Sequence, residues 1–92
     1  MNATKFAVGS KVWQAEMYEN GNLQGRDTEP RATKEEAIAD ARDMWAEYSS
    51  REQSIREVGV AEWLVTESDE DAANGIGGMT NTGNWTLVEP AE

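Results

Sequence analysis

The chain has 92 residues, which suffices for one domain and is too short for a second hydrophobic core. With 18 acidic and 8 basic residues its net charge is −10, which argues against free binding to nucleic acid, because phosphate binding relies on Lys and Arg. It contains no Cys and no His, which excludes thiolate chemistry and disulfides and removes the commonest general base and transition-metal ligand. Solubility alone and a basic protein partner would each account for the charge.

The first predicted element is a β-hairpin. Residues 11–18 alternate apolar and polar side chains, as in a strand with one buried face. The dipeptide Asn20-Gly21 follows, which tolerates positive φ at both central turn positions, and residues 23–28 are predicted to form the returning strand. Pro30 cannot donate a hydrogen bond to a strand ladder, so we expect the chain to leave the sheet there.

The second predicted element is a helix over residues 33–48, expected to end within about a turn of Ser50. Thr33 and Glu36 stand at capping-box spacing, in which the hydroxyl accepts from the Glu36 amide and the carboxylate accepts from the Thr33 amide. Apolar residues at helical spacing predict a face directed at the core. They are Ala37, Ile38, Ala41, Met44, Trp45 and Tyr48.

Acidic residues of the same helix form a second face, which we call the acidic ridge and regard as a candidate site for a basic partner. Its members are Glu36, Asp40, Asp43 and Glu47. The four carboxylates spread over about 16 Å, or about one charge per 5 Å, whereas duplex DNA carries about one per 1.7 Å. The ridge is therefore a sparse mimic of DNA unless other acids, such as Glu16 and Glu19, lie on the same side, and a simple solvated face is the alternative.

The last third of the chain predicts two strands and a long loop. Residues 58–66 are apolar on both parities, which is typical of a central strand with both faces covered or of a strand partly covered by a loop. Residues 85–88 predict a shorter final strand. Residues 67–84 between them predict a Gly- and Asn-rich loop whose acids are further candidates for partner binding. These acids are Glu67, Asp69, Glu70 and Asp71.

The order strand, strand, helix, strand, strand predicts a single α+β domain, with an antiparallel sheet of about four strands and one helix packed across one face. Carboxylates alone can support glycoside hydrolysis, but nothing predicts the apolar pocket that would raise the pKa of one of them. The loop glycines match neither a calcium loop nor a dinucleotide-binding turn. We therefore expect no enzyme, metal or cofactor. We expect a cytoplasmic protein without membrane insertion, since no long apolar run occurs.

Four stretches, at residues 1–6, 12–21, 34–41 and 84–88, carry a resemblance to a known family. Together they resemble the small phage-encoded anti-CRISPR proteins that inhibit type I-F systems. The resemblance implies non-enzymatic binding, in the host bacterial cytoplasm, to the crRNA-guided surveillance complex and interference with its capture of target DNA. Such complexes hold guide RNA and target strand in a positively charged channel, which an acidic protein would occupy.

Two further sets of residues acquire expected roles from this resemblance. Arg26 and Arg31 would reach guide-RNA phosphates if the inhibitor sits directly on the guide. Trp63 and Trp85 are candidates for anchoring the complex, although strand tryptophans are more often part of a core.

A second resemblance leads to a different class of protein. The succession of strand, Asn-Gly turn, strand and Thr-capped helix is also similar to the small domains of HicB-type antitoxins, which would neutralise a basic toxin. A phage structural or adaptor protein is a third interpretation. Co-purification with an RNase-like toxin, co-purification with a guide-RNA complex and presence in virions would distinguish the three.

Overall fold

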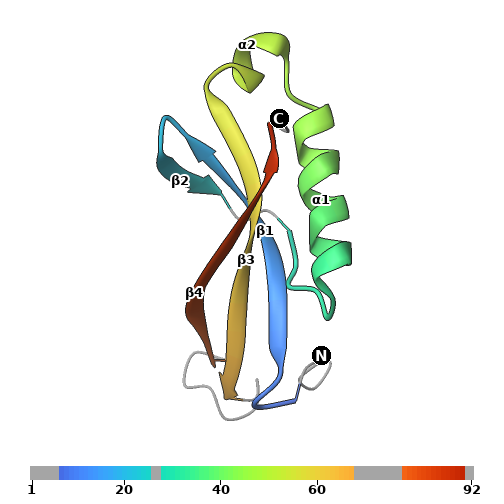
Figure 1. The fold of residues 1–92 in the computed structure, drawn as a ribbon, viewed down its shortest axis with the longest axis vertical. Helices are drawn as coiled ribbons and strands as arrows, with labels where there is room; N and C mark the ends of the chain where they lie inside the picture. Colours follow the sequence, from blue (N-terminus) through green and yellow to red (C-terminus); the bar gives the residue numbers. More distant parts are fainter. Residues whose placement is uncertain (1–6, 26–27, 68–77, 91–92) are drawn as a thin grey trace.

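The computed structural model describes residues 7–25, 28–67 and 78–90. Within them the chain forms, in order, β1 (Lys11–Glu19), β2 (Asn22–Gly25), α1 (Lys34–Ala46), α2 (Ser50–Gln53), β3 (Arg56–Glu67) and β4 (Gly78–Glu89). The strands pair in the order β2-β1-β3-β4 as one antiparallel sheet, and α1 lies along one face (Figure 1). The predicted α+β fold with a four-stranded antiparallel sheet is confirmed.

The predicted hairpin is confirmed by the turn between β1 and β2. Asn20 and Gly21 have φ values of 52° and 83°. Positive φ at both positions matches the twist of the flanking strands, which explains why this dipeptide joins them without splaying the sheet. Strand β2 covers Asn22–Gly25, residues 26 and 27 lie outside the described residues, and Thr28, at the end of the predicted strand, is not part of a strand.

Beyond β2 the chain returns to the edge of β1. Arg31 and Trp13 exchange two backbone hydrogen bonds, of 2.9 and 2.7 Å, in an isolated bridge. The prediction that the chain leaves the sheet at Pro30 is therefore only partly right. Proline lacks a backbone donor, but the next residue has one and uses it.

The start of α1 is capped largely as predicted. Thr33 has extended dihedral angles, and its hydroxyl accepts from the Glu36 amide at 3.3 Å. The Glu36 carboxylate, however, accepts from the Thr33 hydroxyl at 2.9 Å, where the prediction had the Thr33 amide. One orphan amide of the first turn is thus satisfied by this side chain.

The expectation of a single helix is corrected at its end. Helix α1 stops at Ala46, and a second, short helix follows with a complete capping box formed by Ser49 and Glu52. The two residues stand at the Ser-x-x-Glu spacing that marks a helix start, within a stretch whose polar composition suggests only the end of a helix.

The main core lies between α1 and the sheet. Its fully buried residues are all small or β-branched, and they are Ala15, Ala37, Ala41, Val58 and Val60. The larger members of the predicted apolar stripe, including Trp45 and Met44, are partly buried against this cluster, so the core-facing direction of the stripe is confirmed. Alanines on the helix allow its backbone to approach the sheet closely.

Strand β3 is central, and both of its faces are covered, as predicted. Val58 and Val60 pack toward α1, and strand alternation places Ala61 and Val65 on the opposite face, where they are also buried. We call this opposite side the helix-free face.

The predicted loop over residues 67–84 is wrong for its last part, since β4 begins at Gly78 and not at Trp85. Met79 and Thr80 pair with Val65 and Leu64. Between the pairs Trp63–Asn81 and Ala61–Trp85, β4 has two extra residues, and Gly83 has a φ of 90° there. This bulge contains Gly83 and Asn84, two of the Gly and Asn residues that suggested a loop. Asp69, Glu70 and Asp71 lie outside the described residues.

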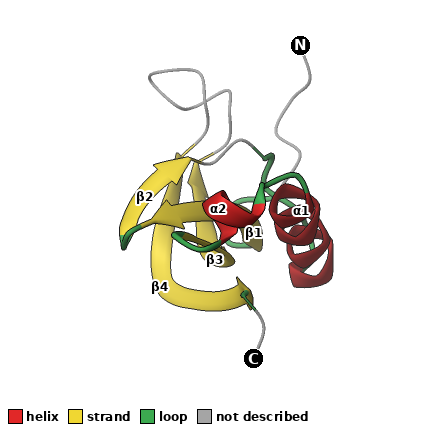
Figure 2. Ribbon diagram, turned by 90° about the horizontal axis from the view of Figure 1, so that it is seen from above, coloured by secondary structure: helices red, strands yellow, loops and turns green. Residues whose placement is uncertain are grey.

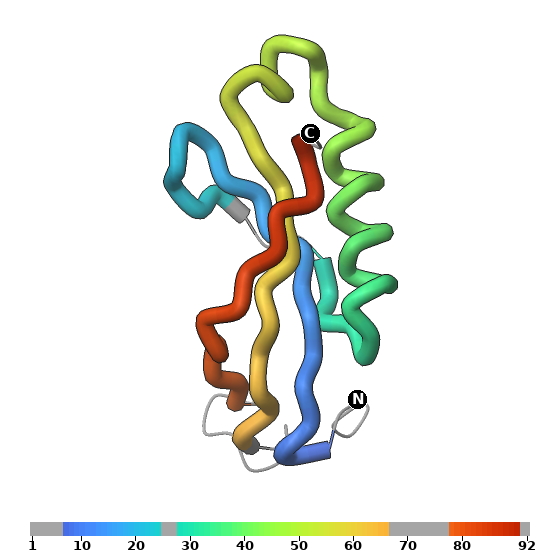
Figure 3. The backbone as a smooth tube through the Cα atoms, viewed as in Figure 1, coloured from blue at the N-terminus to red at the C-terminus, as the bar shows by residue number. Residues whose placement is uncertain are grey.

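The molecule is elongated, with extents of 43 × 22 × 22 Å. Helix α1, with 13 residues, is about 20 Å long. The sheet continues past the N-terminal end of α1, as the backbone trace shows (Figure 3). Viewed from above, β4 bends around the sheet, whereas α1 covers only one side of it (Figure 2). Part of the sheet on the α1 side is therefore not covered by the helix.

Candidate protein-binding surfaces

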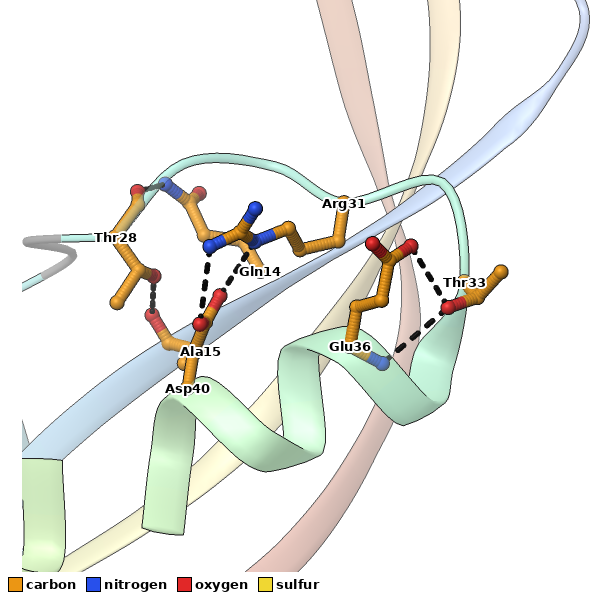
Figure 4. A network of polar contacts seen from close by, with 7 residues as sticks. All are labelled: Gln14, Ala15, Thr28, Arg31, Thr33, Glu36 and Asp40. Atoms are coloured by element: carbon orange, nitrogen blue, oxygen red, sulfur yellow. Dashed lines mark hydrogen bonds and ion pairs between the residues drawn. The ribbon is translucent and has the colours of Figure 1, made fainter. Parts of the chain in front are cut away.

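The acidic ridge on α1 is present but interrupted. Glu36, Asp43 and Glu47 are exposed. Asp40 is half-buried, and its two carboxylate oxygens accept from the Arg31 guanidinium at 2.7 and 3.1 Å (Figure 4). The hydrogen bond to Asp40 and its charge raise the pKa of Arg31 above its usual value. Asp40 is thus neutralised by a bidentate pair, and three ridge carboxylates face solvent.

The Arg31–Asp40 pair joins two residues for which the sequence suggested separate partners. Arg31 was a candidate for guide-RNA phosphate and Asp40 for a basic protein surface, yet each is the ionic partner of the other. The backbone of Arg31 is at the same time bonded to Trp13. The pair therefore ties the segment before α1 to both the helix and the sheet. Arg26, the other candidate for guide RNA, lies outside the described residues.

The segment before α1 makes further polar contacts with the edge of β1. The Gln14 side-chain amide donates to the Thr28 carbonyl at 2.6 Å, and the Thr28 hydroxyl donates to the Ala15 carbonyl at 3.1 Å (Figure 4). These bonds cover part of an edge that would otherwise offer unpaired backbone groups to another chain.

The hairpin acids do not add to the ridge. Glu16 is only 1% exposed and, next to the core residue Ala15, points to the helix-free face. The Glu19 carboxylate accepts from the Arg56 guanidinium at 2.9 Å. Glu16 and Glu19 therefore do not increase the charge density of the acidic ridge toward that of DNA.

Arg56 uses its charge within the fold. Besides Glu19, it approaches Glu52 at 3.2 Å and stacks over the Tyr48 ring at 4.8 Å from its centroid. The hydrogen bond to Glu19 raises the pKa of Arg56. Hydrogen bonds from the amide and hydroxyl of Ser49 lower the pKa of Glu52. This network fastens α2 and the end of α1 to the sheet.

The helix-free face carries an exposed aromatic group. Trp85 is 38% exposed, and its ring meets the ring of Tyr18 edge-on, with centroids 4.9 Å apart and planes 75° apart. Beside them lies an open depression of about 250 Å³, lined by Tyr18, Gly21, Glu57 and Trp85. Trp85 was a candidate for core or anchor, and its exposure leaves it accessible to a partner, while Trp63 on the same face is partly buried.

A polar cluster lies on the α1 side of the sheet, centred on Glu62. Its carboxylate accepts from Asn84 at 2.9 Å and from Thr82 at 2.8 Å, and Lys11 is 3.9 Å away. The bond from Asn84, then that from Thr82, lowers the pKa of Glu62. The sequence does not reveal this cluster, because its composition predicts a loop at Thr82 and Asn84, whereas both residues lie in the strand beside β3.

Within residues 7–25, 28–67 and 78–90, no three His, Cys, Asp or Glu side chains gather closely enough to hold a metal ion. Neither helix of this part of the chain has the length and apolar character required to cross a bilayer. Comparisons of the sequence with protein-family models and with curated proteins, and of the structure with solved structures, gave no match.

Proposed function

We propose that the protein is a phage-encoded anti-CRISPR inhibitor that binds the type I-F crRNA-guided surveillance complex and blocks target DNA by occupying its path. The observation that carries the proposal is the alignment of Glu36, Asp43 and Glu47 as exposed carboxylates on one helix of a chain with a net charge of −10. The partner is the basic DNA-binding channel of the complex. The protein acts without catalysis, in the cytoplasm of the bacterial host.

Charge and close contacts affect different steps of the proposed binding. Long-range attraction between an acidic protein and a basic channel raises the association rate, whereas close apolar and aromatic contacts determine how slowly the complex dissociates. The exposed ridge carboxylates are too widely spaced to reproduce a nucleic-acid backbone. We assign them to attraction, and we assign slow release to accessible aromatic residues such as Trp85.

The ion pair of Arg31 alters one part of the proposal. Breaking a bidentate guanidinium–carboxylate pair to reach guide RNA would leave Asp40 without its partner. In our proposal Arg31 therefore positions the start of α1 and does not contact the guide.

One observation favours a second function. The order of β1, Asn-Gly turn, β2 and Thr33-capped α1 is the arrangement on which the resemblance to HicB-type antitoxins depends. An antitoxin would direct its acidic ridge at a basic toxin. The partner then differs in kind, since it would be one small RNase-like protein and not a multisubunit guide-RNA complex.

Size-exclusion chromatography of the protein with purified type I-F surveillance complex separates these functions. We expect the protein to co-elute with the complex, with less co-elution as the salt concentration rises, because screening weakens interactions between exposed charges. Elution as a separate peak at low salt would contradict the proposal. Pull-down from the native host would then show whether a basic RNase-like partner is bound instead.

A further inference from the structure

The residues that line the depression beside Trp85 are of the kinds that bind a cation. The ring planes of Tyr18 and Trp85 are 75° apart, so the edge of one ring points at the face of the other, and the two rings form a corner. The face of an aromatic ring is negative, and a cation placed over it within about 6 Å is attracted. Glu57, on the neighbouring strand and directly opposite Tyr18 in the β1–β3 register, adds a carboxylate to the same depression.

Two glycines leave the space that this arrangement of rings and the depression beside it require. Gly59 lies under Trp85, and a Cβ there would collide with the indole and with the Thr86 carbonyl oxygen. The indole therefore reaches across β3 to Tyr18 on β1, since Gly59 has no side chain to prevent it. Gly21 in the hairpin turn lines the depression without filling it.

The charge of the depression is available to a ligand. Among the described residues Glu57 has no ionic partner, whereas Glu19 and Glu52 nearby are both paired with Arg56. An aromatic corner with one carboxylate complements a planar guanidinium, which stacks on a ring and donates two parallel hydrogen bonds to a carboxylate. A Lys ammonium is more strongly hydrated and has no planar face with which to stack.

We infer that the depression lined by Tyr18, Gly21, Glu57 and Trp85 binds the side chain of an arginine presented by a partner protein. The guanidinium lies against Trp85 and Tyr18, and its N–H groups donate to the Glu57 carboxylate. The inference rests on the proposed function only for the identity of the partner.

The test is an NMR titration of the intact protein with the capped tripeptide N-acetyl-Gly-Arg-Gly-amide in the millimolar range. The matched probe replaces Arg by citrulline, which has nearly the same shape and no charge. We expect the Trp85 indole N–H and the Gly21 amide to shift with the Arg peptide and to remain unmoved with the citrulline peptide. Equal shifts with both probes, or shifts spread over α1, would overturn the inference.

Substitutions show whether binding of the Arg peptide depends on the depression or on the overall negative charge of the protein. Trp85→Ala is expected to weaken binding of the Arg peptide by roughly 2- to 30-fold, and Glu57→Gln by up to roughly 5-fold. Glu35→Gln removes the same charge from an exposed position of α1 outside the acidic ridge and is expected to leave binding unchanged. Equal weakening by Glu35→Gln and Glu57→Gln would show that only net charge matters. Glu57→Gln remains informative if Trp85→Ala fails to fold.

The same variants distinguish failure of this inference from failure of the proposed function. If the protein does not bind the surveillance complex but binds the Arg peptide through Trp85, the depression is an arginine site and the partner is another protein. If the complex binds wild type, Trp85→Ala and Glu57→Gln equally well, the function stands and this depression is not the contact.

Discussion

Trp85 owes its position to the absence of a side chain at Gly59. The indole crosses the central strand over that glycine and reaches Tyr18 two strands away in the sheet. Nothing in the spacing of apolar residues reveals this contact, because β-strand periodicity predicts a face but not the reach of a ring across it. A single glycine in a strand that otherwise favours Val and Leu was the available signal.

Gly59→Ala is expected to destabilise the protein by roughly 1 to 3 kcal/mol, because the new methyl group overlaps both an indole and a backbone carbonyl. Near-UV circular dichroism should change as Trp85 leaves Tyr18, and thermal melts measure the loss. The double variant Gly59→Ala/Trp85→Ala is the control, since it relieves the overlap with the indole. An unchanged melting temperature for Gly59→Ala would mean that Trp85 does not lie over β3.

The contribution of Glu62 to the stability of the fold is expected to depend on pH. Hydrogen bonds from Asn84 and Thr82 lower its pKa, so its ionised form stabilises the fold at pH values above the unfolded-state pKa. This stabilisation is lost as the pH falls through the lower, folded-state pKa. Asn84→Ala should raise the pKa of Glu62 toward its usual value in a carbon-detected NMR titration. Lys11→Met, which removes a contact at 3.9 Å, is expected to have a smaller effect. A pKa unaffected by Asn84→Ala would mean that this hydrogen bond is not formed.

At the scale of elements, we assign α1 two roles, one structural and one in partner binding. Its N-cap at Thr33 serves the structural role. Thr33→Ala removes the hydroxyl that accepts from the Glu36 amide and is expected to lower the free energy of unfolding by about 1 kcal/mol. Thr33→Ser keeps the hydroxyl and should be close to wild type in a urea melt. If Ser and Ala are equally destabilising, the hydroxyl is not the cause.

The second role, partner binding, is the one that we propose for the acidic ridge. Reversal of its exposed members Glu36, Asp43 and Glu47 to Lys is expected to leave the fold intact, because exposed charges contribute little to stability. Partner binding should weaken mainly through a slower association rate, with a reduced dependence on salt. Surface plasmon resonance at several salt concentrations measures both. Asp40 is left unchanged in this variant, since its pair with Arg31 would otherwise be broken. A ridge-reversed protein that binds as fast as wild type would assign these charges to solubility alone.

At the scale of the whole molecule, the sequence predicted what depends on local chemistry. The turn at Asn20-Gly21, the hydroxyl cap at Thr33 and the buried face of α1 follow from short-range rules, and the structure confirms each. In the predicted capping box, the Glu36 carboxylate accepts from the Thr33 hydroxyl in place of the Thr33 amide. The central position of β3 was predicted from its apolar residues on both parities.

Long-range features were not predicted, for physical reasons that particular residues make clear. Residues 78–84 resemble a loop in composition, and only their pairing with β3 around the bulge at Gly83 makes them a strand. Arg31 and Asp40 are nine residues apart, and the chain path before α1 determines that they meet. The depression requires Tyr18, Glu57 and Trp85 from three strands, and no local pattern brings them together.

We propose that the protein prevents capture of target DNA by occupying the DNA path of the surveillance complex. A mobility-shift titration measures this most directly, with purified type I-F complex preincubated with the protein before labelled target duplex is added. We expect the shifted DNA band to disappear at stoichiometric protein, and the ridge-reversed variant to need a higher concentration for the same effect. If the complex still binds the duplex in full while its degradation stops, competition for the DNA path is wrong.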